Sequence, residues 1–269
     1  MGTIGFIGSG NMAEALIRGI INAKLYSPDN VLISDIRRER LDYLAEEYKV
    51  KSAENNTALT AAADVIVLSI KPQNMDEVLQ EIQGTLKDSA VVISIAAGIT
   101  TDKIIGYLGD IPVIRAMPNT PAMVDQGATV VVIRNTGPRH FKVGLDVFMA
   151  VGKVEVIEDE SLIDAVTAIS GSGPAYFFLL MEEMIKSAKQ LGLPSDIAKE
   201  LVFQTAKGAG LLSELAYARN ETPAQLRERV TSPGGTTEAA MKVFQERDFD
   251  GIMMAALAAA RDRSRELSG

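Results

Sequence analysis

The chain has 269 residues, 47% hydrophobic and 23% charged, which is typical of a globular protein long enough to bury a core. Its formal net charge of −8 argues against a nucleic-acid-binding protein, because such proteins need a basic face to neutralise phosphates. The lack of cysteine and the single histidine, His140, exclude disulfides, thiolate nucleophiles and histidine- or thiolate-based metal sites. The carboxylates are scattered over predicted helix surfaces, so no metal is expected.

The sequence has no feature that predicts membrane targeting. Its start, MGTIGFIGSG, lacks the basic region of a secretory signal, and Phe6 stands where a myristoylation motif needs serine or threonine. The longest fully apolar run, Ile252 to Ala260, is nine residues long and too short to cross a bilayer. We therefore expect a cytoplasmic protein with no membrane partner.

The first half of the chain alternates short apolar runs with helical patterns. Most of the runs are apolar throughout, as in strands that are buried on both faces of a parallel sheet. This alternation predicts right-handed strand–helix–strand units in a Rossmann-type, doubly wound parallel sheet. The predicted strands are 3–7, 31–34, 65–70, 91–96, 113–117, 129–133 and 153–157, and the predicted helices between them include 13–23, 38–48 and 75–86.

A glycine-rich loop joins the first predicted strand to the first helix. Gly8-x-Gly10-x-x-Ala13 follows the strand directly and opens the helix, which is the context of a dinucleotide-binding motif. Gly8 permits the tight turn, Gly10 lets the diphosphate approach the backbone, and Ala13 lets the helix pack on the strand. Free N–H groups and the helix dipole then favour phosphate. We predict that this loop binds a dinucleotide.

The end of the second strand gives conflicting signals about which cofactor binds. Asp35 is the acidic residue that accepts hydrogen bonds from a ribose, which favours NAD. Arg37 and Arg38 follow and are suited to the 2′-phosphate of NADP, although they fit a solvated helical turn equally well. We expect NADPH or NADH, with NADPH slightly favoured.

Other turns at strand ends are candidates for the same site, because ligands of open α/β sheets lie beyond the carboxyl ends of the strands. Lys71-Pro72 ends the third long strand, and Ala96-Ala97 ends the fourth. Asn56 precedes a small helix, where it either contacts the adenosine end of the cofactor or caps that helix.

From residue 160 onward the pattern is helical, which predicts an all-α domain at 160–269 after an NAD(P)-binding domain at 1–159. Ser195 and Thr222 are candidate N-caps. The helices carry wide apolar surfaces, which form either the core of a bundle or the interface of a homodimer; we favour the dimer. The predicted helices are 173–192, 195–218, 222–230 and 249–266.

The predicted site lacks a conventional proton donor. A nicotinamide enzyme that reduces a ketone needs one, and His140 lies in a polar turn away from the strand ends. A dehydrogenase of 3-hydroxy acids that uses Lys71 stays possible, as does a non-catalytic NAD(P)-binding protein. A protonated C=N bond removes the requirement, because it is already an electrophile and needs only to be bound and oriented.

The turn in VTSPGGTTEAAM has the composition of an anion site. Gly234 and Gly235 expose backbone N–H groups ahead of a helix, and Thr236 and Thr237 add hydroxyls, which suits a carboxylate. A well-capped helix is the simpler explanation of that turn alone. Two further rigid polar turns, RAMPNTPA and SGSGPAYF, favour a binding role.

These motifs identify a family. IGFIGSGNMAEA, SIKP, SIAAG, RAMPNTPA, SGSGPAY and VTSPGGTTEAAM occur in the order and spacing of pyrroline-5-carboxylate reductases, which the chain resembles over its whole length. The resemblance implies reduction of L-Δ1-pyrroline-5-carboxylate to L-proline with NAD(P)H, the last step of proline biosynthesis. It also implies a helical domain that dimerises, with the dimers often assembled into a decamer.

The resemblance also assigns residues. Thr237 would bond the ring nitrogen as the catalytic residue, and the N–H groups of its turn would hold the carboxylate. The cofactor side would comprise Gly8, Ser9, Gly10, Asn11, Met12, Asn56, Ile70, Lys71, Pro72, Ala96 and Ala97. Asp35 and Arg37 are added to this set from the end of the second strand, not from the resemblance. The substrate side would comprise Met117, Pro118, Asn119, Thr120, Gly234, Gly235, Thr236 and Thr237.

Two positions depart from the family. Asp35 is acidic where several NADPH-preferring members have serine or threonine, which leaves the cofactor preference open. Asn220 replaces a carboxylate that some members carry before the helix that starts at Thr222, so no role is assigned to it.

Overall fold

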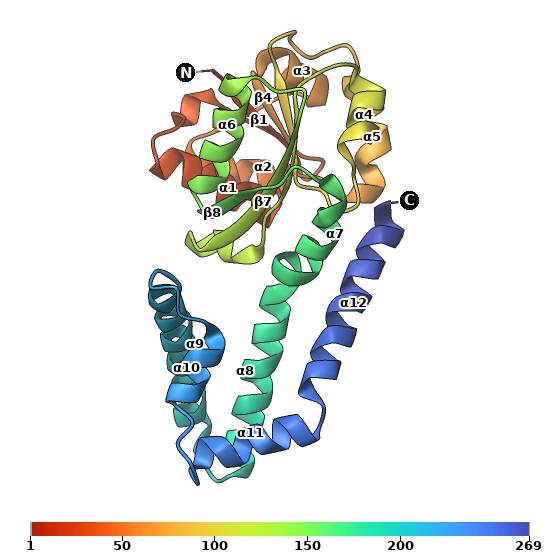
Figure 1. The fold of residues 1–269 in the computed structure, drawn as a ribbon. Coiled ribbons are helices and arrows are strands. Elements are labelled where there is room, and N and C mark those ends of the chain that lie inside the picture. Colours follow the sequence, from red (N-terminus) through yellow and green to blue (C-terminus); the bar gives the residue numbers. More distant parts are fainter. Residues whose placement is uncertain (1, 269) are drawn as a thin grey trace. The chain divides into compact units, whose positions relative to one another are not determined.

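A computed structural model describes residues 2–268 (Figure 1). The chain forms two compact units. The sheet unit comprises the residues up to Pro174 and again those from Ala259 onward, and the helical unit comprises Ala175–Ala258. These units do not coincide with the predicted domains 1–159 and 160–269, which stay a prediction.

The sheet unit is built on one eight-stranded sheet in the order β3-β2-β1-β4-β5-β6-β7-β8. Neighbouring strands are parallel except β6 and β7, which are antiparallel. The doubly wound parallel sheet is therefore confirmed, with one reversal that the sequence did not predict. The strands are β1 (Ile4–Ile7), β2 (Val31–Ser34), β3 (Lys51–Ser52), β4 (Val65–Leu68), β5 (Val91–Ser94), β6 (Val113–Met117), β7 (Gly127–Arg134) and β8 (Gly152–Val156).

Helices cover both faces of the sheet, which explains why its central strands are apolar throughout (Figure 1). One core joins Phe6 and Val67 to residues of α1, α2 and α6, such as Leu16 and Phe148. The other joins Ile66 to residues of α3, α4 and α5, such as Leu79. The helices are α1 (Asn11–Asn22), α2 (Arg38–Tyr48), α3 (Asn56–Ala62), α4 (Met75–Ile82), α5 (Thr101–Leu108), α6 (Pro138–Met149) and α7 (Ile163–Val166).

The remaining helices form the helical unit, except that α8 begins at the end of the sheet unit and the part of α12 from Ala259 onward belongs to the sheet unit. Thr222 caps α10 in a capping box with Gln225, as predicted. Ser195 is the first residue of α9 and does not cap it, because Pro194 occupies the cap position. The helices are α8 (Gly173–Gln190), α9 (Ser195–Tyr217), α10 (Pro223–Arg229), α11 (Thr236–Glu246) and α12 (Phe249–Ser268).

Much of the apolar surface of α8 and α9 is exposed within the chain. Large side chains that stand more than half exposed include Phe177, Phe178, Leu179, Leu201, Phe203, Leu211, Leu212 and Leu215. By length and composition alone, the stretch Glu160–Gln190 is apolar enough to cross a membrane, with a mean hydropathy of 1.2. Polar residues interrupt this stretch, so no long unbroken apolar run marks it in the sequence. Only 17% of the window is buried in the chain, so its apolar surface lacks an internal partner.

Candidate cofactor and substrate sites

The glycine loop between β1 and α1 has the geometry of a phosphate-binding turn. Gly8 has φ +88°, and its N–H donates to the carbonyl of Ser34 at 2.8 Å. A Cβ at Gly8 would lie 2.4 Å from the carbonyl oxygen of Ser69, so no larger residue fits there. A Cβ at Gly10 would meet nothing within 4 Å. The space beside Gly10 is therefore open for a ligand.

The start of α1 offers unused hydrogen-bond donors. Gly10 is its N-cap, has an extended conformation and makes no side-chain capping bond. Asn11 and Met12, which were predicted as part of the loop, form the first turn of the helix, where N–H groups lack intrahelical partners. Open space in front of uncapped donors at a helix N-terminus fits the diphosphate of a dinucleotide.

The carboxylate of Asp35, at the end of β2, is held by hydrogen bonds and an ion pair from its own chain. Its side chain is 7% exposed and accepts the N–H of Ser9 at 2.7 Å and that of Arg37 at 2.9 Å. The Arg37 guanidinium pairs with it at 3.1 Å. Burial raises the pKa of Asp35, but the hydrogen bonds from Arg37 and Ser9 outweigh it and hold the pKa below its ordinary value. The carboxylate is thus ionised and its charge is offset by Arg37.

Two neighbours complete this corner of the site. Arg38, the second arginine considered for a 2′-phosphate, is exposed and pairs with Asp42 at 3.3 Å. Ile36, which no motif of the sequence marks, is 97% exposed between Asp35 and Arg37. Because its apolar side chain is exposed to solvent beside the glycine loop, Ile36 is a candidate to contact the cofactor. In the sequence it could be recognised only as a single apolar residue among charged ones.

Asn56 does not cap its helix, so that alternative was wrong. The cap of α3 is Asn55, whose side chain accepts the N–H of Ala58 at 2.8 Å. Asn56 accepts the hydroxyl of Ser34 at 2.8 Å and donates to Glu81 at 2.7 Å. It therefore ties the end of β2 to α4, close to Asp35, and its contact with the adenosine stays a prediction.

The other predicted cofactor residues lie at the same edge of the sheet. Because β1, β4 and β5 are adjacent and parallel, the turns that follow them share one edge. Ile70, Lys71 and Pro72 follow β4, and Ala96 and Ala97 follow β5. Lys71 is exposed in an extended conformation, as expected for the residue before proline.

The end of β6 is packed and internally bonded. Met117, Pro118 and Asn119 are buried, whereas Thr120 is exposed. The Asn119 amide donates to the carbonyl of Ser170 at 3.0 Å and accepts the N–H of Ala128 at 2.9 Å. The structure therefore brings RAMPNTPA and SGSGPAY together, and the Asn119 side chain holds the backbone of Ser170 and Ala128 in place.

A π-helix, Thr167–Gly171, leads into the SGSGPAY turn. Such bulges are rare and occur frequently at functional sites. Nothing in the local composition predicts it, since it depends on how the chain packs after α7. It places the Ser170 carbonyl where Asn119 binds it.

The second turn of interest lies in the helical unit, at the start of α11. Gly234 has φ +72°, which favours glycine, and its N–H donates to Glu238 at 2.7 Å. The Gly235 N–H donates to the backbone carbonyl of Ser232 at 3.0 Å, so neither glycine N–H is free. Gly235 caps α11 without a side-chain bond. The donors available to an anion are therefore those of the first helical turn, beginning at Thr236.

The two threonines of that turn differ in environment. Thr236 is exposed and Thr237 is half-buried. Across residues 2–268, no hydrogen bond of the structure uses either hydroxyl. Both hydroxyls are available to a substrate, and Thr237 is the better enclosed of the two.

A buried ion pair lies beside the sheet edge and was not predicted. Arg115 of β6 is 3% exposed and donates to Glu160 at 2.8 Å. Glu160 also accepts the N–H and hydroxyl of Thr101, which fastens the start of the helical sequence region to α5. Burial raises the pKa of Glu160, but its bonds to Thr101 and Arg115 outweigh it and lower the pKa below the ordinary value.

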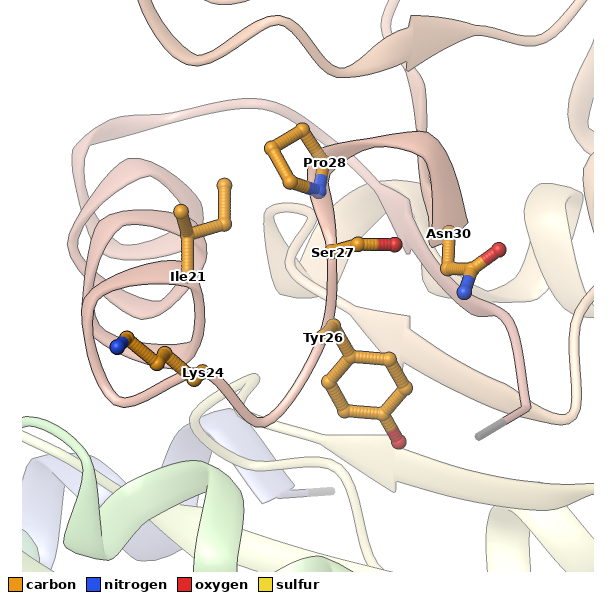
Figure 2. Close-up of a pocket in the computed structure, with 6 residues that line it drawn as sticks. All are labelled: Ile21, Lys24, Tyr26, Ser27, Pro28 and Asn30. Atoms are coloured by element: carbon orange, nitrogen blue, oxygen red, sulfur yellow. The ribbon is translucent and has the colours of Figure 1, made fainter.

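A pocket of about 460 Å³ lies elsewhere, between the end of α1 and the start of β2 (Figure 2). This is the amino end of β2, away from the glycine loop. Burial, then the nearby charge of Asp64, raises the pKa of Tyr26 to about 12, so its phenol is neutral. The pocket presents no catalytic chemistry. Its lining residues are Ile21, Lys24, Tyr26, Ser27, Pro28 and Asn30.

Comparisons with known proteins match both parts of the chain. Residues 160–267 match the model of pyrroline-5-carboxylate reductase dimerisation, and residues 3–98 match that of coenzyme F420-dependent NADP oxidoreductases. The pyrroline-5-carboxylate reductase of Pseudomonas aeruginosa is 43% identical over 98% of this chain and 96% of its own length. The chain belongs to the pyrroline-5-carboxylate reductase family.

Solved structures of the family share the fold. A pyrroline-5-carboxylate reductase from Coxiella burnetii has a TM-score of 0.90 and 38% identity, covering 100% of this chain and 99% of its own. The Plasmodium falciparum pyrroline carboxylate reductase, solved with NADP bound, has a TM-score of 0.88 and 29% identity, covering 99% of this chain and 98% of its own. The match to the dimerisation model covers α8 and α9, whose apolar surface is exposed within the chain.

Proposed function

We propose that the protein is an NAD(P)H-dependent pyrroline-5-carboxylate reductase, which forms L-proline in the last step of proline biosynthesis. The observation that carries this conclusion is similarity over the whole chain to reductases of one activity. The glycine loop and the turn at α11 supply the two anion-binding features that the reaction requires.

On the cofactor side, the open space at Gly10 and the donors of Asn11 and Met12 would hold the diphosphate, with Asp35 and Arg37 at the ribose. The remaining cofactor residues are Gly8, Ser9, Asn56, Ile70, Lys71, Pro72, Ala96 and Ala97. The reduced nicotinamide supplies a hydride to the carbon of the C=N bond.

On the substrate side, the chain needs only to bind and orient the imine. The nitrogen of the protonated imine already carries its proton, so accepting a hydride at carbon completes the amine without a further acid. The Thr237 hydroxyl would bond that nitrogen as the catalytic residue, and the first-turn donors of α11 would hold the carboxylate. Met117, Pro118, Asn119, Thr120, Gly234, Gly235 and Thr236 complete the proposed substrate site.

We further propose a cytoplasmic homodimer that assembles into a decamer. The exposed apolar side chains of α8 and α9 support association, because a surface this apolar is costly in water. The matches at residues 3–98 and 160–267 support a cofactor domain at 1–159 and a dimerisation domain at 160–269. Light scattering of the purified protein measures the mass; a monomer at micromolar concentration would contradict the dimer.

The test of function is the loss of NADPH or NADH absorbance with pyrroline-5-carboxylate as substrate. A dehydrogenase of hydroxy acids would instead act on those with NAD(P)+, and a cofactor sensor would turn over neither. The variant Thr237→Ala should lower kcat by about 100-fold, the loss of one hydrogen bond at the reacting atoms, while NADPH affinity is unchanged. Thr231→Ala, which removes a nearby hydroxyl bonded to the Arg227 carbonyl, is the matched control. Full activity of Thr237→Ala would refute the assigned role.

A further inference from the structure

An acidic residue stands where the cofactor's phosphates should bind. Glu14 lies in the first turn of α1, one turn after Gly10. A carboxylate in that turn stabilises an isolated helix, but it repels a diphosphate bound in front of the same turn. The site therefore has to neutralise Glu14 if it is to hold the cofactor.

Three groups from α2 converge on Glu14. The Arg40 guanidinium binds one carboxylate oxygen, and the hydroxyls of Tyr43 and Tyr48 donate to the other at 3.1 and 3.0 Å. Burial raises the pKa of Glu14, but the bonds from Arg40 and Tyr48 outweigh it and lower the pKa below its ordinary value. Glu14 is thus ionised at neutral pH, and its charge is cancelled by Arg40.

Arg40 also reaches the loop itself. Its Nε donates to the carbonyl oxygen of Ser9 at 2.6 Å. On the other side of the same residue, the Ser9 N–H donates to Asp35 at 2.7 Å. Ser9 is fully buried, so its backbone is fixed from both sides by side chains that follow β2. The fork of arginine makes both contacts at once, which the single ammonium of lysine cannot reproduce.

We propose that Arg40 is a positioning residue for cofactor binding, which holds the Ser9 carbonyl and cancels the charge of Glu14 beside the phosphate site. This inference rests on the proposed function, since it requires that the loop binds NAD(P)H. Arg40 acts on the diphosphate, which both cofactors share, whereas Arg37 acts at the ribose, where they differ.

Two effects of Arg40 on cofactor affinity need to be separated: its hold on the Ser9 carbonyl and its cancellation of the Glu14 charge. Equilibrium titration of cofactor fluorescence measures the Kd of each variant. Arg40→Gln loses both contacts and should raise Kd at least tenfold, by the same factor for NADPH and NADH. Glu14→Gln removes the charge while Arg40 still holds Ser9, so Kd should stay the same or fall. The double variant should bind more tightly than Arg40→Gln and less tightly than the wild type. Lys142→Gln, which removes one positive charge from an exposed pair on α6, is the control.

The measured Kd values distinguish failure of the proposed function from failure of the role proposed for Arg40. A wild type that binds neither cofactor overturns the proposed function, whereas a wild type that binds both and an Arg40→Gln variant with unchanged Kd overturn this inference alone. A loss confined to NADPH would make Arg40 a ligand of the 2′-phosphate. Equal Kd values for the double variant and Arg40→Gln would exclude charge cancellation. If Arg40→Gln does not fold, a Glu14→Gln variant with raised Kd still refutes the proposal.

Discussion

We expect alanine to act differently at the two glycines of the loop. At Gly8 it should destabilise the fold, and at Gly10 it should weaken cofactor binding. Gly8 has φ +88°, which costs about 1–2 kcal/mol for alanine. The added Cβ would also meet the Ser69 carbonyl at 2.4 Å, and relieving that overlap costs about 1–3 kcal/mol because the neighbour is backbone. Gly8→Ala should therefore lower the free energy of unfolding by about 2–5 kcal/mol.

Gly10→Ala should leave the fold intact and weaken cofactor binding. Gly10 has φ −72°, which alanine adopts freely, and its Cβ would meet nothing, so the free energy of unfolding should change by less than about 1 kcal/mol. The new methyl group occupies the space predicted for the diphosphate, so the Kd of NADPH should rise at least tenfold, about 1.4 kcal/mol.

Urea unfolding of the cofactor-free variants, compared at one protein concentration, measures the first effect, and fluorescence titration with NADPH measures the second. Undiminished NADPH binding by Gly10→Ala would show that the open space is not the diphosphate site. Unchanged unfolding of Gly8→Ala would refute the reasoning from the Ser69 carbonyl.

Two further predictions concern charge. Arg37→Gln leaves Asp35 without its counter-ion, so kcat/KM for NADPH should fall at least tenfold relative to that for NADH; an unchanged ratio would contradict a role at the 2′-phosphate. Glu160→Gln should cost about 2 kcal/mol of stability at pH 7. Because folding lowers the pKa of Glu160, its contribution is complete above the unfolded pKa and is lost as pH falls through the folded value. The difference in free energy of unfolding between wild type and variant should therefore narrow as the pH falls below about 4.5, the ordinary pKa of glutamate, and a constant difference would contradict the linkage.

The sequence predicts the sheet well because its central strands are apolar on both faces. Val31–Ser34 and Val113–Met117 were placed to the residue. The pattern does not give strand direction, so the antiparallel β7 was not predicted. β3 has only two residues, both exposed, and carries no apolar signal. α5 was missed because Thr101–Leu108 is short and lies between two predicted strands.

The site is less predictable than the fold, because its contacts join residues that are distant in sequence. The glycine loop is local and was found from its motif. The bond of Arg40 to Ser9 spans 31 residues, and that of Arg115 to Glu160 spans 45. No local pattern distinguishes Arg40 from its exposed neighbour Arg38. Only the folded structure shows that Arg40 bonds Ser9 and Glu14, whereas Arg38 stays exposed.

The helices of this chain begin in two ways that bear on the proposed binding sites. Side chains of Asn55, Thr100 and Thr222 cap α3, α5 and α10, which satisfies an N–H donor of each. By contrast, α1 and α11 begin at glycines with extended backbone and no side-chain cap, and these are the two helices at which we propose that phosphate and carboxylate bind.

A missing cap is not sufficient to identify a binding terminus. α6 also begins at an uncapped glycine, Gly137, but Pro138 follows and removes one of its donors. At α1 and α11 the donors are retained, by Asn11 and Met12 in one and by Thr236 and Thr237 in the other. An uncapped glycine costs stability that a serine or aspartate in its place would supply, but such a side chain would occupy the donors that an anion needs. The missing caps at α1 and α11 are therefore what the proposed binding of anions at these two helix starts requires.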